Sequence, residues 1–243
     1  MRHEAYRLVG TPRLGGVLVV CDHASNRVPD DIDLGVDPAL MTEHVAWDIG
    51  VAAIAERLAA RAGTAAFLAN VSRLVCDFNR DEDAPGAIPI ASDGHVIRGN
   101  DLGHEQREAR LDRLFRPYHA ALAKLLDDVP PALILSLHSF TPRLASHPEE
   151  ERPWHVGVLY NGDERASRIA IPMLEAEGLC VGDQEPYSGK LLNATMNRHA
   201  EQEGRPYLGI EIRQDQIGDE AGQAVWAERL ARICRAVALR LAE

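Results

Sequence analysis

The chain has 243 residues, 46% of them hydrophobic and 26% charged, and a formal net charge of −11. This length suits one large domain with a substantial core, and the composition is typical of soluble globular proteins. The negative charge argues against nucleic acid or an anionic membrane as the main partner, because both select basic surfaces. A small anionic substrate stays compatible with it, since a site can be locally basic.

Neither the N-terminus nor any later segment carries a signature of export or membrane insertion. The first ten residues contain no hydrophobic targeting segment, and no apolar run approaches the ~20 residues of a membrane span. Cys21, Cys76, Cys180 and Cys234 are scattered, lack CxxC spacing and lie mostly in apolar runs. We therefore expect a cytoplasmic protein whose cysteines are buried free thiols.

Short apolar segments alternate with helical patterns along the chain. The apolar segments are brief and bounded by Gly, Pro or charge, which is typical of parallel strands buried on both faces. The helical segments have apolar residues at i, i+3 and i+4 spacing; one closes on Gly63, and another should bend or restart at Pro117. In chain order we predict strand 16–20, helix 37–63, strand 64–70, helix 103–129, strands 132–137 and 154–160, helix 163–178, strand 207–212 and helix 222–243.

This alternation predicts an α/β sandwich around a mostly parallel sheet. Residues 1–243 show no internal repeat, low-complexity segment or change of composition that would mark a linker, so we expect a single domain. In such sheets, ligands bind outside the carboxyl ends of the strands. The residues that follow the apolar segments are therefore the candidates for a site.

Polar side chains gather where the predicted strands end. Two imidazoles and a carboxylate with one open position are how catalytic zinc is held, and a further glutamate outside the metal serves as the base. The ligands would come from separate strands, so no compact motif such as HExxH is present. The residues concerned are Asp22, His23, Asp48 (early in the first predicted helix), Arg73, Asp77, Asn79, Arg80, His138, Ser139, Glu211, Arg213 and Asp215.

Structural roles stay open for these residues. A histidine at a strand end is often a hydrogen-bonded core residue, and Asp48 could be solvated or paired with an arginine. Arg73 and Arg80 could form ion pairs, or could bind a substrate carboxylate through paired hydrogen bonds. Glu211 and Arg213 share one side of a strand, where a buried salt bridge is the alternative. No GxSxG elbow or phosphate-binding glycine loop points to another chemistry.

Several segments together resemble the N-formylglutamate amidohydrolase family. They are CDHASNRVP, HVAWDIG, VSRLVCDFNR, LHSF and NRHAEQEGRPYLGIEIRQD, and they occur in family order between about residues 17 and 217. The resemblance implies a three-layer α/β/α fold of the phosphorylase/hydrolase-like type. It also implies zinc-dependent cleavage of the C–N bond of an acylated amino acid, with N-formyl-L-glutamate giving formate and L-glutamate in the named members.

The order of residues is also similar to that of zinc N-acetylmuramoyl-L-alanine amidases. That similarity implies His23, Asp48 and His138 as ligands of one zinc ion and Glu211 as the base. Asn26 is the alternative to Asp48, because carboxypeptidase-like enzymes take a ligand three residues after the first histidine. Asp22 or another carboxylate would orient the imidazole of His23.

The family resemblance further implies a substrate site. It assigns Arg80 to anchor the substrate, with Arg73 as helper and Asn79 and Ser139 beside them. Apart from the resemblance, we expect Arg213 to act as a nearby donor that helps the zinc to stabilise the oxyanion. CDHASN stands where the formylglutamate-degrading members tend to have PHSG, which leaves the acyl group and the amino acid open. A small-molecule binding protein without catalysis and a metal amidase acting on peptide or cell-wall fragments are the alternative functions.

Overall fold

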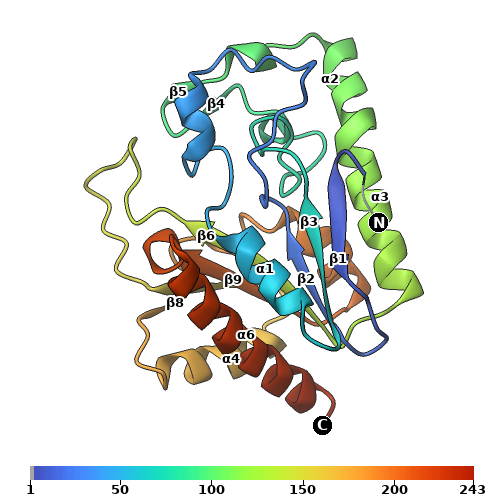
Figure 1. Ribbon diagram of the computed structural model, residues 1–243, viewed down its shortest axis with the longest axis vertical. Coiled ribbons are helices and arrows are strands. Elements are labelled where there is room, and N and C mark those ends of the chain that lie inside the picture. Colours follow the sequence, from blue (N-terminus) through green and yellow to red (C-terminus); the bar gives the residue numbers. More distant parts are fainter. Residues whose placement is uncertain (1–2) are drawn as a thin grey trace.

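The computed structural model describes residues 3–243 and is built around a seven-stranded sheet (Figure 1). The strand order is β1-β3-β2-β6-β9-β7-β8. The central strands β3, β2, β6 and β9 run parallel to one another. Strand β1 pairs antiparallel with β3, and β7 pairs antiparallel with β9, whereas β8 runs parallel to β7. The strands are β1 (Tyr6–Gly10), β2 (Val17–Cys21), β3 (Thr64–Ala69), β6 (Leu133–Phe140), β7 (Val156–Leu159), β8 (Val181–Asp183) and β9 (Tyr207–Arg213), and a separate hairpin joins β4 (Ala91–Ser92) to β5 (His95–Val96).

Helices cover both faces of the sheet (Figure 1). Helices α1 (Val51–Ala59), α4 (Arg165–Glu175) and α6 (Glu220–Leu241) share one core with one face of the sheet. On the other face lie a π-helical turn at Leu111–Phe115 and α3 (Arg116–Asp128), and α2 (His104–Arg110), which has no buried residue, leads into this turn. The remaining helical pieces are α5 (Ala194–His199) and short 3-10 turns at Pro38–Thr42, Pro85–Ala87, Arg98–Asn100, Glu201–Glu203 and Gln214–Gln216.

The central strands are buried on both faces because their side chains alternate between two apolar cores. In β2, Val19 and Cys21 enter the core beneath α1 and α6, whereas Leu18 and Val20 enter the core beneath α3. The structure therefore confirms the three-layer α/β/α architecture with a mostly parallel sheet. Within residues 3–243, no helix has the length and apolarity needed to cross a membrane.

Several elements differ from the sequence-based expectation. The predicted helix 37–63 is helical only at Pro38–Thr42 and Val51–Ala59, and Asp48 lies in the turn before α1 instead of within a helix. The long helix does restart next to Pro117, directly after the π-helical turn. Strands β1, β4, β5 and β8 and helix α5 were not predicted. Cys180 is exposed, contrary to the expectation of buried thiols, whereas the other three cysteines are buried.

Candidate active site

The candidate site lies at the carboxyl ends of three adjacent strands. His23 follows β2, while His138 lies near the end of β6 and Glu211 near the end of β9. Because β2, β6 and β9 are neighbours and run parallel, their carboxyl ends meet at one edge of the sheet. His138 and Glu211 are direct register partners. The sheet topology therefore produces the crevice at the carboxyl ends of the strands that the sequence predicts.

The turn before α1 brings Asp48 to the same edge. Its backbone N–H donates to the carbonyl of His23 at 2.9 Å, and its Oδ2 lies 3.3 Å from the backbone nitrogen of Ser139. The Ser139 hydroxyl donates to the carbonyl of Ile49 at 3.0 Å. Gly50 then enters α1 with φ +86°, where a Cβ atom would lie 2.5 Å from the carbonyl oxygen of Ile217. Only glycine fits this close, left-handed passage.

His23, Asp48 and His138 form one compact cluster. Asp48 Oδ2 lies 3.3 Å from His23 Nδ1 and 2.9 Å from His138 Nδ1. One donor atom from each of the three residues lies within 4.8 Å of the others, and all three residues are buried. The side-chain amide nitrogen of Asn26, the alternative third ligand, donates to the carbonyl of Met41 at 2.8 Å.

Each imidazole has a second carboxylate on its far nitrogen. His23 Nε2 lies 2.8 Å from Asp77 Oδ1, and His138 Nε2 lies 3.5 Å from Asp22 Oδ2, which is an ion-pair separation. The hydroxyl of Tyr118 on α3 donates to Asp22 Oδ1 at 2.7 Å. Asp22 therefore faces His138, and Asp77 takes the place beside His23 that the sequence offered to Asp22. Such outer carboxylates fix the orientation of metal-binding imidazoles.

Negative charge predominates in and around the cluster, and the charges there shift the pKa values of its residues. Burial acts to lower the pKa of His138, but the carboxylates of Asp22 and Asp48 outweigh it and raise that pKa well above its ordinary value. For His23, burial and Arg73 are outweighed by Asp77 and Asp48, so its pKa is also raised. Burial acts to raise the pKa of Asp48, but the two imidazoles lower it overall. The cluster therefore favours bound positive charge.

These residues fit a divalent metal ion. Two imidazole nitrogens and one carboxylate oxygen are the donor set of catalytic zinc sites. Glu211 stands outside this set, and its Oε2 is buried with no hydrogen-bond partner in the described part of the chain. Burial raises the pKa of Glu211 to about 7. A carboxylate with this pKa can accept or release a proton near neutral pH.

A cavity of about 140 Å³ opens onto the cluster and Glu211. Arg73 pairs with Asp77 at 2.9 Å and with Asp48 at 3.5 Å, whereas Arg80 lies 3.7 Å from Asp77. Four residues that the sequence assigned to substrate, Arg73, Asn79, Arg80 and Ser139, all line this cavity, together with His23, His44, Asp48, His138, Phe140, Thr141, Tyr187, Leu192 and Glu211. Of the residues predicted to be metal ligands, to serve in catalysis or to bind substrate, only Arg213 is absent from the cavity lining.

The sequence model of the N-formylglutamate amidohydrolase family matches residues 15–218. The chain belongs to this family. It is accordingly a hydrolase that acts on amides. Comparison with curated protein sequences found no match.

Two crystal structures are similar to this chain over nearly its whole length. A gene product, Atu2144, from Agrobacterium tumefaciens has 30% sequence identity and a TM-score of 0.91, with 99% of this chain and 97% of that chain covered. An N-formylglutamate amidohydrolase from Ralstonia eutropha JMP134 has 20% identity and a TM-score of 0.74, with 98% of each chain covered. The second similarity concerns the fold alone.

In this amidohydrolase, Arg213 lies outside the cavity. Its guanidinium pairs with Asp215 at 2.8 Å and donates to the backbone carbonyls of Arg152 and Pro153 at 3.0 and 3.1 Å. Arg213 therefore connects the end of β9 both to Asp215 and to the segment that precedes β7, and it does not line the cavity. The segment IEIRQD therefore contains both Glu211, which lines the cavity, and Arg213, which binds the segment before β7.

Sequence reasoning missed part of the cavity wall. His44, Phe140, Thr141, Tyr187 and Leu192 line it without having been assigned a role. Phe140 and Thr141 directly follow His138 and Ser139, so extending the strand-end rule by two residues would have found them. Tyr187 and Leu192 lie in the irregular segment between β8 and α5, where no strand end marks a site.

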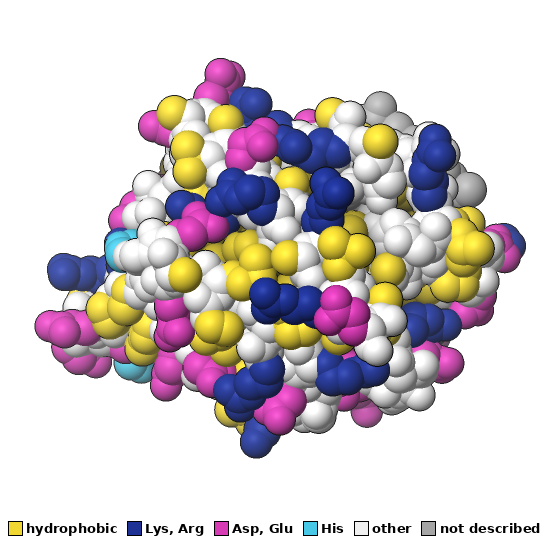
Figure 2. Space-filling model, turned by 90° about the horizontal axis from the view of Figure 1, so that it is seen from below, with side chains coloured by type: hydrophobic (Ala, Val, Ile, Leu, Met, Phe, Trp, Pro, Cys, Tyr) yellow, Lys and Arg dark blue, Asp and Glu magenta, His cyan; other side chains and the backbone are white. Residues whose placement is uncertain are grey.

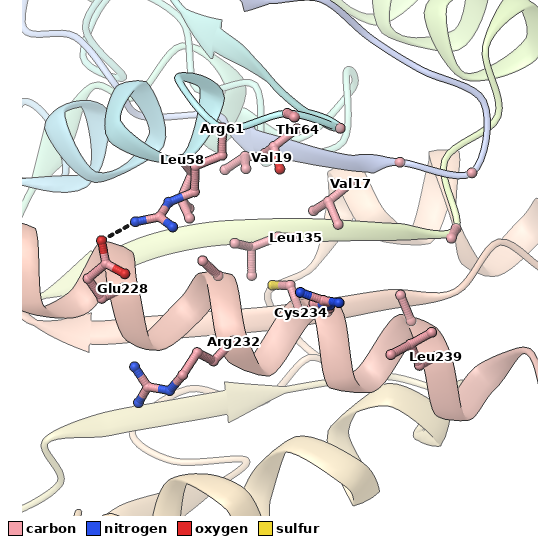
Figure 3. Close-up of a pocket in the computed structure, with 18 of the residues that line it drawn as sticks. Val17, Val19, Leu58, Arg61, Thr64, Leu135, Glu228, Arg232, Cys234 and Leu239 are labelled. Carbon is pink, nitrogen blue, oxygen red and sulfur yellow. Dashed lines mark hydrogen bonds and ion pairs between the residues drawn. The ribbon is translucent and has the colours of Figure 1, made fainter.

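A larger groove, of about 620 Å³, lies at the opposite end of the strands. Val17 and Thr64, which begin β2 and β3, line it together with Leu58 on α1, and an ion pair between Arg61 and Glu228 lies at its edge (Figure 3). Seen from below, this end of the molecule exposes apolar side chains between basic ones (Figure 2). Among its described lining residues, this groove has no histidine or aspartate.

Proposed function

We propose that the protein is a zinc-dependent amidohydrolase that cleaves the C–N amide bond of an N-formyl or N-acyl amino acid similar to N-formyl-L-glutamate. The products would be formate, or the corresponding carboxylate, and the free amino acid. The observation that carries this proposal is the cluster of His23, Asp48 and His138 with the unligated Glu211 beside it. Metal-assisted amide hydrolysis requires this combination of a held cation and a free base.

His23, Asp48 and His138 would hold the zinc ion, and Asp77 and Asp22 would keep the two imidazoles in their binding orientation. When bound, zinc supplies Lewis acidity: it lowers the pKa of a water molecule and polarises a carbonyl group. The surrounding arginines moderate the negative charge of the carboxylates without neutralising it, which leaves the site attractive for a divalent cation.

Glu211 would move the proton. Its carboxylate accepts a proton from the water molecule whose oxygen adds to the carbonyl carbon. The same proton then passes to the nitrogen of the departing amine as the C–N bond breaks, so that one water is consumed and Glu211 is regenerated. The pKa of Glu211, raised by burial to about 7, suits both halves of this transfer near neutral pH.

The cavity favours a small anionic substrate. Its volume of about 140 Å³ is well below the roughly 300–1,000 Å³ of pockets that enclose drug-sized ligands, so it favours an acylated amino acid over a cell-wall fragment. Arg80 is the better candidate to anchor a substrate carboxylate, because Arg73 is already engaged by Asp48 and Asp77. Asn79 and Ser139 would contribute polar contacts beside it.

The proposal is tested by combining metal analysis with a substrate panel. Protein purified without chelators should contain about one zinc per chain. It should release formate from N-formyl-L-glutamate faster than from N-formyl-leucine, and should lose and regain activity on chelation and zinc addition. A protein that retains full activity after chelation would exclude the metal mechanism. A protein with zinc that hydrolyses no N-formyl or N-acetyl amino acid would exclude the substrate class.

A further inference from the structure

Tyr187 occupies a part of the cavity wall that the proposed mechanism does not use. It lies in the segment between β8 and α5 and lines the cavity with Glu211, Arg73 and the metal-binding cluster. Its hydroxyl lies 3.0 Å from Nη1 of Arg152. A guanidinium can only donate hydrogen bonds, so the phenolic oxygen accepts this one and keeps its own proton available to donate. No residue in the described part of the chain is recorded as accepting that proton.

Arg152 is itself held by burial and hydrogen bonds, so it can fix the position of the Tyr187 hydroxyl. Its side chain is only 2% exposed, and its Nε donates to Glu150 at 3.0 Å. The backbone carbonyl of Arg152 accepts a hydrogen bond from Arg213 at 3.0 Å, which ties this segment to the end of β9, two residues beyond Glu211. A series of contacts therefore runs from the strand carrying the base, through Arg213 and Arg152, to the hydroxyl of Tyr187.

We propose that the hydroxyl of Tyr187 donates a hydrogen bond to the oxyanion that forms on the substrate carbonyl, and that Arg152 is its positioning residue. This inference rests on the proposed function. Addition of water to the carbonyl carbon breaks the C=O π bond and places its electron pair on oxygen. A donor already fixed at the cavity wall stabilises this charge without reorganisation. Collapse of the adduct restores the C=O bond as the amine leaves.

The surroundings keep Tyr187 a neutral donor. Burial raises the pKa of its phenol, and the negative charge of Glu211 raises it further, while Arg152 acts in the opposite direction. The phenol thus retains its proton over the range in which the enzyme would work. The bond from Arg152 polarises the O–H group, because drawing electron density toward the guanidinium makes the remaining proton a stronger donor.

Replacing Tyr187 with phenylalanine removes the hydroxyl and leaves the ring in place. For Tyr187→Phe we expect kcat to fall by roughly 10²–10³-fold, as for the loss of one oxyanion donor, with KM within about twofold of wild type. Zinc content should be unchanged. Tyr160→Phe is the matched control, since the Tyr160 hydroxyl bonds Asp183 away from the cavity, and it should leave kcat unchanged.

Inhibitor binding separates stabilisation of the oxyanion from a merely structural role. A phosphinate analogue of the tetrahedral adduct should bind Tyr187→Phe more weakly by a factor similar to the loss in kcat/KM, while the product amino acid binds equally to both proteins. Arg152→Lys should lower kcat in the wild-type background and have no further effect in Tyr187→Phe, because the two residues act as one unit.

The results also distinguish this inference from the proposed function. An active wild-type enzyme with an equally active Tyr187→Phe variant would overturn the role of Tyr187 and leave the amidohydrolase proposal standing. A rise in KM with unchanged kcat would likewise overturn it, because it would show ground-state binding. A wild-type protein that holds zinc but hydrolyses none of the panel would overturn the proposed function and, with it, this inference.

Discussion

His138 and Glu211 face each other as register partners on the parallel strands β6 and β9. The hydrogen-bonded ladder between these strands sets the relative position of the proposed metal ligand His138 and the proposed base Glu211. A base fixed in this way on a central strand would need no loop closure to reach the proposed metal site. The proposed ligand Asp48 depends on a turn, but that turn is tied to both neighbouring strand ends through His23 and Ser139.

Replacing Glu211 with glutamine should abolish turnover and leave the metal bound. The amide is almost isosteric with the carboxylate but cannot accept the proton of the attacking water, so we expect kcat to fall by about 10²–10⁴-fold. Zinc per chain, measured by elemental analysis, should stay at the wild-type value because Glu211 is outside the ligand cluster. Glu203→Gln, at an exposed position, is the control. Substantial residual activity would remove Glu211 from its role.

Asp22→Asn should weaken metal binding without removing a ligand. Asparagine keeps an oxygen for the hydroxyl of Tyr118 but lacks the charge that faces His138 Nε2. Loss of such an outer carboxylate typically costs 10–100-fold in metal affinity, so the Kd for zinc, measured by competition with a chelator, should rise by about that factor. Asp183→Asn on β8, remote from the cluster, should leave the Kd unchanged. Equal affinities for wild type and Asp22→Asn would contradict the arrangement.

Arg80→Ala should change substrate preference more than chemistry. If its guanidinium binds a second carboxylate of the substrate, KM for N-formyl-L-glutamate should rise by about 10–100-fold, while KM for N-formyl-leucine changes little. Kinetics with both substrates measure this difference directly. Arg61→Ala, in the groove at the other end of the strands, controls for the loss of one positive charge. A proportional rise in KM for both substrates would place the anchor elsewhere.

The parts of the site that the sequence predicted share a local signature. His23, His138 and Glu211 each lie at or just beyond the end of an apolar run, and the parallel topology brings such ends to one edge. Asp48 carries no such mark: it lies in a turn whose path depends on contact between Gly50 and the distant Ile217. Helix propensity and apolar periodicity predict that the helix continues through this turn, and tertiary packing around Gly50 prevents that continuation.

The directions of the side chains are the second feature of the site that the sequence does not predict. Asp22 and His23 are adjacent in sequence, yet Asp22 reaches His138, while the partner of His23 comes from Asp77, far along the chain. The sequence names these carboxylates but not their pairing, because the pairing depends on where each side chain points after the strand ends. Tyr187 and Arg152 lie in irregular segments whose course is set by their neighbours, so no periodic pattern predicts that Tyr187 lines the cavity or that Arg152 contacts it.

A pair of buried histidines on the α3 side of the sheet predicts how stability responds to acid. His119 Nε2 lies 3.1 Å from the carbonyl of Phe78, to which it must donate, so its Nδ1 accepts from His199 Nε2 at 2.9 Å. Burial, together with the neighbouring His199, lowers the pKa of His119 to about 3. Burial and the charge of Arg198 lower the pKa of His199 to about 4. Both imidazoles are therefore neutral in the folded protein.

The folded-state pKa values lie below the unfolded value of about 6.5, so the unfolded chain binds more protons as the pH falls. The stability contributed by the neutral pair is complete above about pH 6.5. It is lost at roughly 1.4 kcal/mol per pH unit for each histidine as the pH drops toward 4.

In His199→Gln, an amide can still donate to His119 but cannot titrate. Urea unfolding between pH 7 and 4.5 should therefore show an acid-side slope shallower by about one proton. The exposed His104→Gln should keep the wild-type slope, and parallel curves for wild type and His199→Gln would show that the pair does not govern acid stability.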